Sequence, residues 1–191
     1  AESVRQILLQ TERLVQGEPG FDPATSERTF TIRMSDLVGS LLLPGCMQRL
    51  SRDAPGISLN VLHMSPERSI RALEEDQLDF AISFELEHGK TIHAEPLLAD
   101  RMVCAMRQGH PLSRRRLTLE RFLDAHHLRV AMSPTDLRFV DSKLAQRGLA
   151  RRISLNVPQW LLVPELLRST DLLGVISERI GAKLASQGIV R

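Results

Sequence analysis

The chain has 191 residues, of which 42% are hydrophobic and 25% are charged. It is long enough for one good-sized domain or two small lobes. Its net charge of +2 is too small to indicate a nucleic-acid-binding surface. No window approaches the roughly 20 apolar residues that cross a bilayer, and the first residues lack the order of a signal peptide. We therefore expect a cytoplasmic protein with no membrane partner, unless a leader has been removed.

The cysteines and histidines give no sign of a metal site. Cys46 and Cys104 lie far apart and in no CxxC motif, so we expect two buried, small hydrophobic side chains rather than a disulfide or a zinc site. His126 and His127 are adjacent, and in an extended chain they would point to opposite faces. No nucleophile elbow and no Gly-rich phosphate loop occur. The sequence therefore predicts no metal, no cofactor and no catalytic residues.

The chain opens with a predicted amphipathic helix over residues 2–16, where apolar residues repeat at helical spacing. A connector rich in turn-forming residues follows, and the compact domain is predicted to begin near Arg28. From there strand and helix patterns alternate. We predict strands over 29–34, 57–63, 79–84, 92–98, 102–106, 128–132, 152–157 and 172–176. We predict helices over 38–50, from Ser65 onward, and over 117–125, 139–146, 160–168 and 178–185.

Turn and capping residues mark several element boundaries. Ser35 and Ser65 are suited to cap helices. Pro44 should lie in the first turn of helix 38–50 or kink that helix. Segment 79–84 is nearly all apolar, which predicts a strand buried in a parallel sheet. Repeated strand-then-helix units imply parallel sheets with crossover helices.

Several stretches, taken in their order and spacing, are similar to the effector-binding domain of LysR-type transcription regulators. The similarity runs from about Arg28 to the C-terminus. It is carried by Ser35-Asp36-x-Val38-x-x-x-Leu42-Leu43-Pro44, Ala54-Pro55-Gly56-Ile57-x-Leu59, Leu78-Asp79-x-Ala81-Ile82, Asp100-Arg101-Met102-Val103-Cys104 and Thr170-Asp171-Leu172-Leu173-Gly174. Three sites most resemble the branch of nodulation, naphthalene, salicylate and nitroaromatic regulators. They are 35–36, 100–104 and 157–158.

The chain departs from the family at two places. The family often has Gly near Arg33 and Pro near Ser177, and both are different here. The resemblance implies an α/β fold of two Rossmann-like lobes, of the type 2 periplasmic-binding-protein kind, preceded by a linker helix. Residues 1–27 would be the end of the linker helix and a connector, 28–98 lobe I, and 99–191 lobe II. The family usually continues with a strand and helix that return to lobe I. We therefore expect a fragment, which would reach DNA only through a missing N-terminal helix-turn-helix.

The candidate effector site follows from the ends of the predicted strands. In open α/β sheets ligands bind beyond the carboxyl ends of strands, and a cleft between lobes is a favoured site. Two facing helix starts would hold a carboxylate, and aromatic side chains would cover a ring. The candidate effector-binding residues are Ser35, Asp36, Ser65, Phe84, Ser133, Pro134, Thr135, Phe139, Gln159 and Trp160. By resemblance Ser35, Ser65, Phe84 and Phe139 contact the effector, and the branch suggests an aromatic carboxylate or phenol.

Several candidates have simpler explanations. Ser35, Ser65 and Ser133 are explained equally well as helix caps, and Asp36 as a first-turn charge. Trp160 is the single tryptophan, and it fits core packing as well as the lining of a cleft. These alternatives stay open at the level of the sequence.

Three functions compete. The first is an effector sensor in a LysR-type regulator, acting as a homodimer or homotetramer. Helix 38–50 and strand 57–63 would form the pairing surface, although the helix serves equally well as core. The second is a periplasmic-type solute-binding protein of the same fold. The third is an enzyme of similar fold, such as a late porphyrin-pathway deaminase or a dehydratase, but no catalytic constellation is visible. The opening helix favours the sensor, which binds a small molecule and is not an enzyme.

Overall fold

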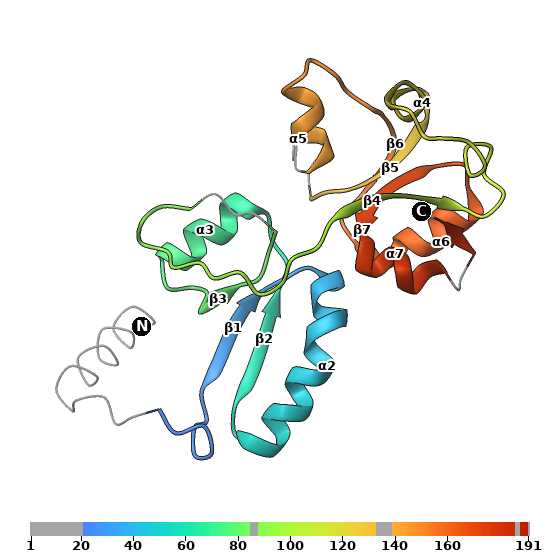
Figure 1. Ribbon diagram of the computed structural model, residues 1–191. Helices are drawn as coiled ribbons and strands as arrows, with labels where there is room; N and C mark the ends of the chain where they lie inside the picture. Colours follow the sequence, from blue (N-terminus) through green and yellow to red (C-terminus); the bar gives the residue numbers. More distant parts are fainter. Residues whose placement is uncertain (1–20, 85–87, 133–138, 186–187, 191) are drawn as a thin grey trace.

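The computed structural model describes residues 21–84, 88–132, 139–185 and 188–190. Within them the chain forms two α/β lobes, one mainly blue and teal and the other mainly yellow to red in Figure 1. The two-lobed α/β prediction is confirmed. The predicted helix 2–16 and the candidates Ser133, Pro134 and Thr135 lie outside the described residues.

Lobe I is built on a parallel sheet whose described strands follow the order β2-β1-β3. Helices connect consecutive strands, so the strands all end at the same edge of the sheet. The strands are β1 (Thr29–Arg33), β2 (Ser58–Leu62) and β3 (Phe80–Ala81). The helices are α2 (Asp36–Asp53) and α3 (Pro66–Glu74).

Serine caps fix where both helices of lobe I begin. The Ser35 hydroxyl accepts the Val38 N–H at 3.3 Å, and the Ser65 hydroxyl accepts the Arg68 N–H at 3.4 Å. Both predicted caps are confirmed. Pro44 lies well inside α2, so of its two expected positions the first turn is excluded.

Two predicted strands of this half are corrected. Segment 79–84 forms a strand only at Phe80–Ala81, and Phe80 is 52% exposed instead of buried. Among the described strands β3 pairs with β1 alone, so one of its sides stays open. Segment 92–98 forms no strand. Pro96 cannot donate to a ladder, and Leu97 remains 67% exposed.

Lobe II is built on a mixed sheet whose described strands follow the order β6-β5-β7-β4-β8. The strands are β4 (Met102–Arg107), β5 (His126–Val130), β6 (Arg152–Val157), β7 (Leu173–Ser177) and β8 (Ile189–Val190). The helices are α4 (Leu119–Asp124), α5 (Val140–Ala145), η1 (Trp160–Leu162), α6 (Val163–Ser169) and α7 (Glu178–Leu184). β4 runs antiparallel to β7 and β8. The wholly parallel sheet is therefore wrong here, because β4 enters from the crossover between lobes.

A cluster of buried hydrophobic residues forms the core of lobe II. Leu128, Leu167, Leu173 and Ile176 are at most 2% exposed. Leu167 of α6 lies over Gly174 of β7, where an added Cβ would stand 3.2 Å from two methyl carbons of Leu167. The missing side chain of Gly174 thus lets α6 approach the sheet closely. This close packing holds α6 against β7 in the core of lobe II.

The segment that joins the lobes is anchored to the end of β7. The Ser177 hydroxyl donates to the Asp100 carboxylate, and Arg179 donates to the Ala99 carbonyl at 3.2 Å. Burial alone would raise the pKa of Asp100. The hydrogen bonds from Ser177 and the Arg101 backbone, with the charge of Arg179, lower this pKa below its usual value. The Ser177 side chain therefore anchors the crossover segment to β7.

The prediction of two buried cysteines is only partly right. Both thiols are free. Cys46 is exposed on α2, because that helix turns other residues toward the sheet, so the prediction is wrong for this residue. Cys104 is half-buried in β4, and burial raises its pKa to about 11. Cys104 therefore stays a protonated thiol at neutral pH.

The adjacent histidines of β5 point in opposite directions, as expected. His126 is exposed, whereas His127 is completely buried. His127 Nε2 lies 2.6 Å from the Phe122 carbonyl oxygen, so Nε2 carries the proton, and Nδ1 accepts from Arg151 at 3.4 Å. Burial is the largest effect on His127 and lowers its pKa below the ordinary value. His127 is therefore a neutral, structural group.

We predict that this burial makes stability acid-sensitive. The folded pKa of His127 lies below the unfolded value of about 6.5, so its contribution is complete above that pH and is lost as pH falls. The free energy of unfolding, measured by urea titration, should decline from pH 7 to about pH 5. His127→Gln keeps both hydrogen-bonding roles without titrating and should flatten that decline. His126→Gln is the matched control, and equal slopes in the wild type and His127→Gln would contradict the prediction.

Candidate functional site

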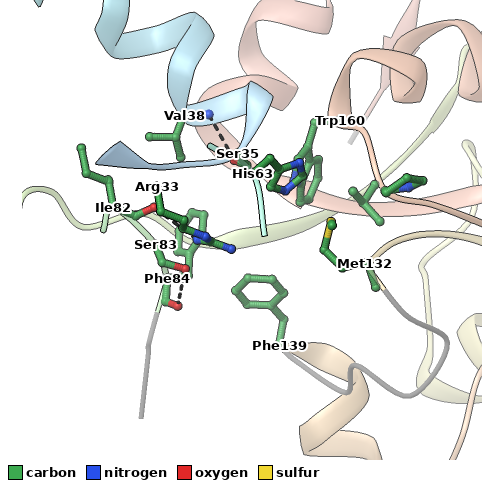
Figure 2. Close-up of a pocket in the computed structure, with 13 residues that line it drawn as sticks. Arg33, Ser35, Val38, His63, Ile82, Ser83, Phe84, Met132, Phe139 and Trp160 are labelled. Carbon is green, nitrogen blue, oxygen red and sulfur yellow. Dashed lines mark hydrogen bonds between the residues drawn. The ribbon is translucent and has the colours of Figure 1, made fainter. Parts of the chain in front are cut away.

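A cleft lies where strand ends of the two lobes meet (Figure 2). It contains about 440 Å³ of space between atoms, part of it open to solvent. Its position, beyond the last residues of β1 and β5, is where open α/β sheets bind ligands. Lobe I lines it with Arg33, Ser35, Val38, His63, Ile82, Ser83 and Phe84. Lobe II lines it with Val130, Ala131, Met132, Phe139, Pro158 and Trp160.

The structure brings some of the sequence candidates together and leaves others apart. Those that line the cleft are Ser35, Phe84, Phe139 and Trp160. Those described but absent from its lining are Asp36, Ser65 and Gln159. Ser65 caps α3, and Gln159 precedes η1 without a side-chain capping bond.

Sequence reasoning missed several cleft residues that end strands. Arg33 is the last residue of β1 and His63 follows β2, so the rule that selected Ser35 also applies to them. In the sequence, Arg33 is notable only because the family often has Gly near this position. The sequence shows no pattern that would distinguish the apolar lining residues, such as Ile82 and Met132, from residues of the hydrophobic core.

Two phenylalanines from different lobes meet at the cleft. The ring centroids of Phe84 and Phe139 lie 5.3 Å apart with an interplanar angle of 86°. Such an edge-to-face pair is worth about 0.5–1.5 kcal/mol. Phe139, just before α5, has φ of 54° and ψ of −121°, a costly conformation for a residue with a Cβ. The pair therefore joins the lobes through a strained residue.

A hydrogen bond also joins the lobes beside the cleft. The Leu161 N–H of η1 donates to Asp36 Oδ2 at 2.8 Å. Asp36, at the start of α2, thus contacts lobe II. Its second carboxylate oxygen is buried and has no hydrogen-bond partner among the described residues. Asp36 therefore contributes to contact between the lobes rather than to the lining of the cleft.

Arg33 brings a positive charge to the lobe I wall. Its side chain is buried, since the residue is only 3% exposed. Nε and Nη2 donate to the Met64 carbonyl at 3.2 and 2.9 Å, and Nη1 donates to the Ile82 carbonyl at 3.4 Å. Figure 2 shows the guanidinium end of Arg33 extending toward the side of the cleft where Phe139 lies. These bonds fix the plane and direction of the guanidinium.

A second pocket adjoins the cleft, and both are lined by Val130, Phe139 and Trp160. Trp160 also packs against the core of lobe II, so the two roles foreseen for it coexist. Arg151 lines the second pocket and donates to both oxygens of Asp141 at 2.7 and 2.8 Å. The side chains of this pair are 4% and 11% exposed. The lining of the second pocket, to which Trp160 also belongs, thus contains a buried ion pair.

The described cleft residues are suited to binding a ligand. Ser35, Ser83, His63 and Arg33 offer polar groups among aromatic and aliphatic side chains. Across the described residues no three His, Cys, Asp or Glu side chains gather as a metal site requires. No described helix is long and apolar enough to cross a membrane.

Two α/β lobes with a cleft at their facing strand ends define a protein of the type 2 periplasmic-binding-like fold. The family model described as the LysR substrate binding domain matches residues 23–191. The chain therefore belongs to this family, and the resemblance predicted from its sequence is confirmed.

Relatives agree with this assignment. The chain is 33% identical over 180 residues to the HTH-type transcriptional activator NahR of Pseudomonas putida, covering 94% of the chain and 60% of NahR. It is 29% identical over 181 residues to nodulation protein D 2 of Bradyrhizobium elkanii, covering 94% and 54%. A probable transcriptional regulator of Pseudomonas aeruginosa, PA0477, has a TM-score of 0.85 and 32% identity, covering 100% of the chain and 64% of that structure. The chain thus spans about three fifths of the length of NahR.

We predict that the buried ion pair below the cleft responds asymmetrically to mutation. Asp141→Asn leaves the Arg151 guanidinium buried without a carboxylate and should lower the free energy of unfolding by about 3 kcal/mol. The double variant Asp141→Leu with Arg151→Met removes both charges and should recover most of that loss. Urea unfolding of both variants checks this. A double variant no more stable than Asp141→Asn would show that the loss comes from packing rather than from an uncompensated charge.

Proposed function

We propose that the chain is the sensing part of a LysR-type transcription regulator, with lobe I over residues 28–98 and lobe II over 99–191. A small-molecule effector would bind in the cleft. The observation that carries this proposal is the lining of one cleft by strand-end residues of both lobes. A ligand that touches both lobes binds one lobe arrangement more tightly than others and shifts the population toward it.

An aromatic acid or a phenol is the effector class that the lining supports. Phe84, Phe139 and Trp160 provide aromatic faces and edges around the cleft, which suit a planar ring. Ser35 and Ser83 add hydroxyl groups for polar substituents. The ring pair between Phe84 and Phe139 would rearrange to admit such a ligand, which couples binding to the contact between lobes.

Membership of the LysR family favours the sensor over a periplasmic-type solute-binding protein, which shares only the fold. Family membership also favours binding over catalysis. In this proposal the effector leaves the cleft chemically unchanged, and DNA contacts belong to a helix-turn-helix elsewhere in the regulator.

Self-association would use α2 and β2 of lobe I, giving a homodimer or homotetramer. β2 lies at an edge of the described sheet, and its Val61 is 39% exposed. Met47 of α2 is 46% exposed, and Leu41–Leu43 are only half-buried. An apolar helix face beside an open strand edge is suited to pairing with a second copy.

We predict that an aromatic effector raises thermal stability and changes the fluorescence of Trp160, the single tryptophan. In a screen of aromatic carboxylates and phenols, a ligand at 100 times its Kd should add about 2.7 kcal/mol. Phe84→Ala should weaken binding about tenfold. Phe80→Ala, which changes an exposed phenylalanine of the same lobe, is the matched control.

A panel that produces no stabilisation would remove the aromatic effector. Conversion of a bound compound into a product, followed by chromatography, would refute the sensor.

We also predict that Met47→Glu lowers the oligomeric state. A charge at a paired apolar surface is desolvated without a partner, so the dimer should dissociate about a hundredfold more readily. Sedimentation velocity measures the change in mass. Leu119→Glu, at a 48% exposed position on α4 of lobe II, is the control and should keep the wild-type mass. An unchanged mass in Met47→Glu would exclude this surface.

A further inference from the structure

Positive charge is distributed very unevenly along this chain, although its net charge is only +2. Residues 99–191, assigned to lobe II, contain 16 Lys and Arg against 8 Asp and Glu, which is a net charge of +8. Residues 28–98 of lobe I contain 7 against 10, a net charge of −3, and residues 1–27 also carry −3. Charge asymmetry between two parts of one chain indicates binding to a polyanion. The small net charge therefore conceals a basic lobe.

Ion pairs inside lobe II engage only some of its arginines. Those pairs are Arg101–Glu178, Arg107–Asp171, Arg151–Asp141, Arg168–Glu165 and Arg179–Asp100. Other arginines of this lobe are exposed and form no ion pair with the described residues, namely Arg114, Arg115, Arg116, Arg121, Arg147 and Arg152. Exposed guanidinium groups without a carboxylate partner are available to an external anion.

Four of these arginines, which lie before and in α4, are at the end of lobe II opposite the cleft. β5 and β6 run parallel, and Val130 at the end of β5 lines the cleft. α4 leads directly into the start of β5, so it lies beside the other end of the same strand. Figure 1 shows α4 and the loop before it on the side of lobe II away from lobe I. We call Arg114, Arg115, Arg116 and Arg121 the basic surface.

Hydrogen bonds hold the backbone of the basic surface against lobe II. The N–H and the hydroxyl of Ser113 both donate to the carbonyl of the buried His110, at 2.9 and 2.8 Å. His110 Nε2 in turn lies 3.1 Å from the Asp171 carbonyl oxygen. Arg121 Nη1 donates to the Arg116 carbonyl at 2.8 Å, which joins α4 to the loop. Because this backbone is already ordered, little chain entropy would be lost when the surface binds a partner.

The composition of the basic surface suits phosphate groups of a duplex. All four residues are arginine, whose planar guanidinium can donate two parallel hydrogen bonds to one phosphate. Segment 114–121 contains no aromatic residue on which an unpaired base could stack. Contacts of this kind depend on charge and not on base sequence.

We propose that the basic surface of lobe II binds the phosphate backbone of duplex DNA without regard to sequence. The inference rests on the proposed function only for the source of that DNA. In the proposed regulator a helix-turn-helix would read the operator, and the basic surface would contact phosphates beside it. About four phosphate contacts give weak binding alone, but attachment to the same DNA through the helix-turn-helix raises the effective concentration.

Fluorescence anisotropy of a labelled duplex tests the basic surface in the chain of 191 residues. The duplex has about 20 base pairs of arbitrary sequence, and the titrations run at KCl concentrations from about 20 to 200 mM. The Kd should be about 10 μM at the lowest salt, and a duplex of unrelated sequence should give the same value. The logarithm of the association constant should fall against the logarithm of salt with a slope of about −3 to −4, since each phosphate contacted contributes about −0.9.

Replacing the arginine run should remove most of this binding. Arg114→Gln, Arg115→Gln and Arg116→Gln combined should weaken binding at least about tenfold at the lowest salt and make the slope shallower by about 3. The corresponding triple lysine variant keeps all three charges and should stay within about threefold of the wild type.

The matched control removes the same number of charges from lobe I. Arg68, Arg71 and Lys90 are exposed and form no ion pair with the described residues. Their combined replacement by Gln should keep the Kd within about twofold and leave the slope unchanged, because charges distant from the contact are screened.

The other outcomes each overturn the inference. Absence of binding at the lowest salt would remove the DNA contact, while the sensing function would stand, because the cleft lies at the other end of the lobe. An equal loss in the lobe I control would show diffuse attraction rather than a defined surface. An equal loss in the lysine and glutamine variants would show that the shape of the loop matters and not its charge. Poly-L-glutamate of equal charge that competes as well as the duplex would assign the surface to an acidic protein instead of DNA.

Discussion

Contact between the two lobes is the constraint on which the candidate site depends. Each sheet alone presents only half of the cleft, because the lining residues come from strand ends on both sides. The Phe84–Phe139 ring pair and the bond from Leu161 N–H to Asp36 bring these edges together. The crossover near Asp100 is anchored to lobe II by Ser177. In the proposed function, a ligand that contacts both lobes would therefore shift their relative arrangement.

The two lobes differ in how much apolar surface they bury. The fully buried leucines and isoleucines belong almost wholly to lobe II, and Gly174 allows α6 to lie close against the sheet there. The described sheet of lobe I is smaller, and α2 exposes much of its apolar surface. Movement between the lobes would thus leave the core of lobe II intact.

Sequence reasoning succeeded where structure is decided locally. Ser35 and Ser65 are predicted correctly as helix starts, because a side-chain cap depends only on the first turn of its own helix. It failed where pairing partners decide. Segment 92–98 has the pattern of a strand but pairs with no strand of the described residues, and β4 runs antiparallel because it enters lobe II from the crossover. At the site, Ser35 and Phe84 could be found from strand ends. The burial of Arg33 could not be predicted, because it depends on the Met64 and Ile82 carbonyls, which are distant in the sequence.

The backbone of Phe139 has an energetic consequence for the opening of the cleft. A residue held at φ of 54° and ψ of −121° stores about 1–3 kcal/mol, which is released when its surroundings let it relax. Separation of its ring from Phe84 costs about 0.5–1.5 kcal/mol. These two amounts are of similar size and opposite sign. If Phe139 relaxes when the two rings separate, the strain released would offset the loss of the ring contact, so opening of the lobes at this pair would cost little free energy.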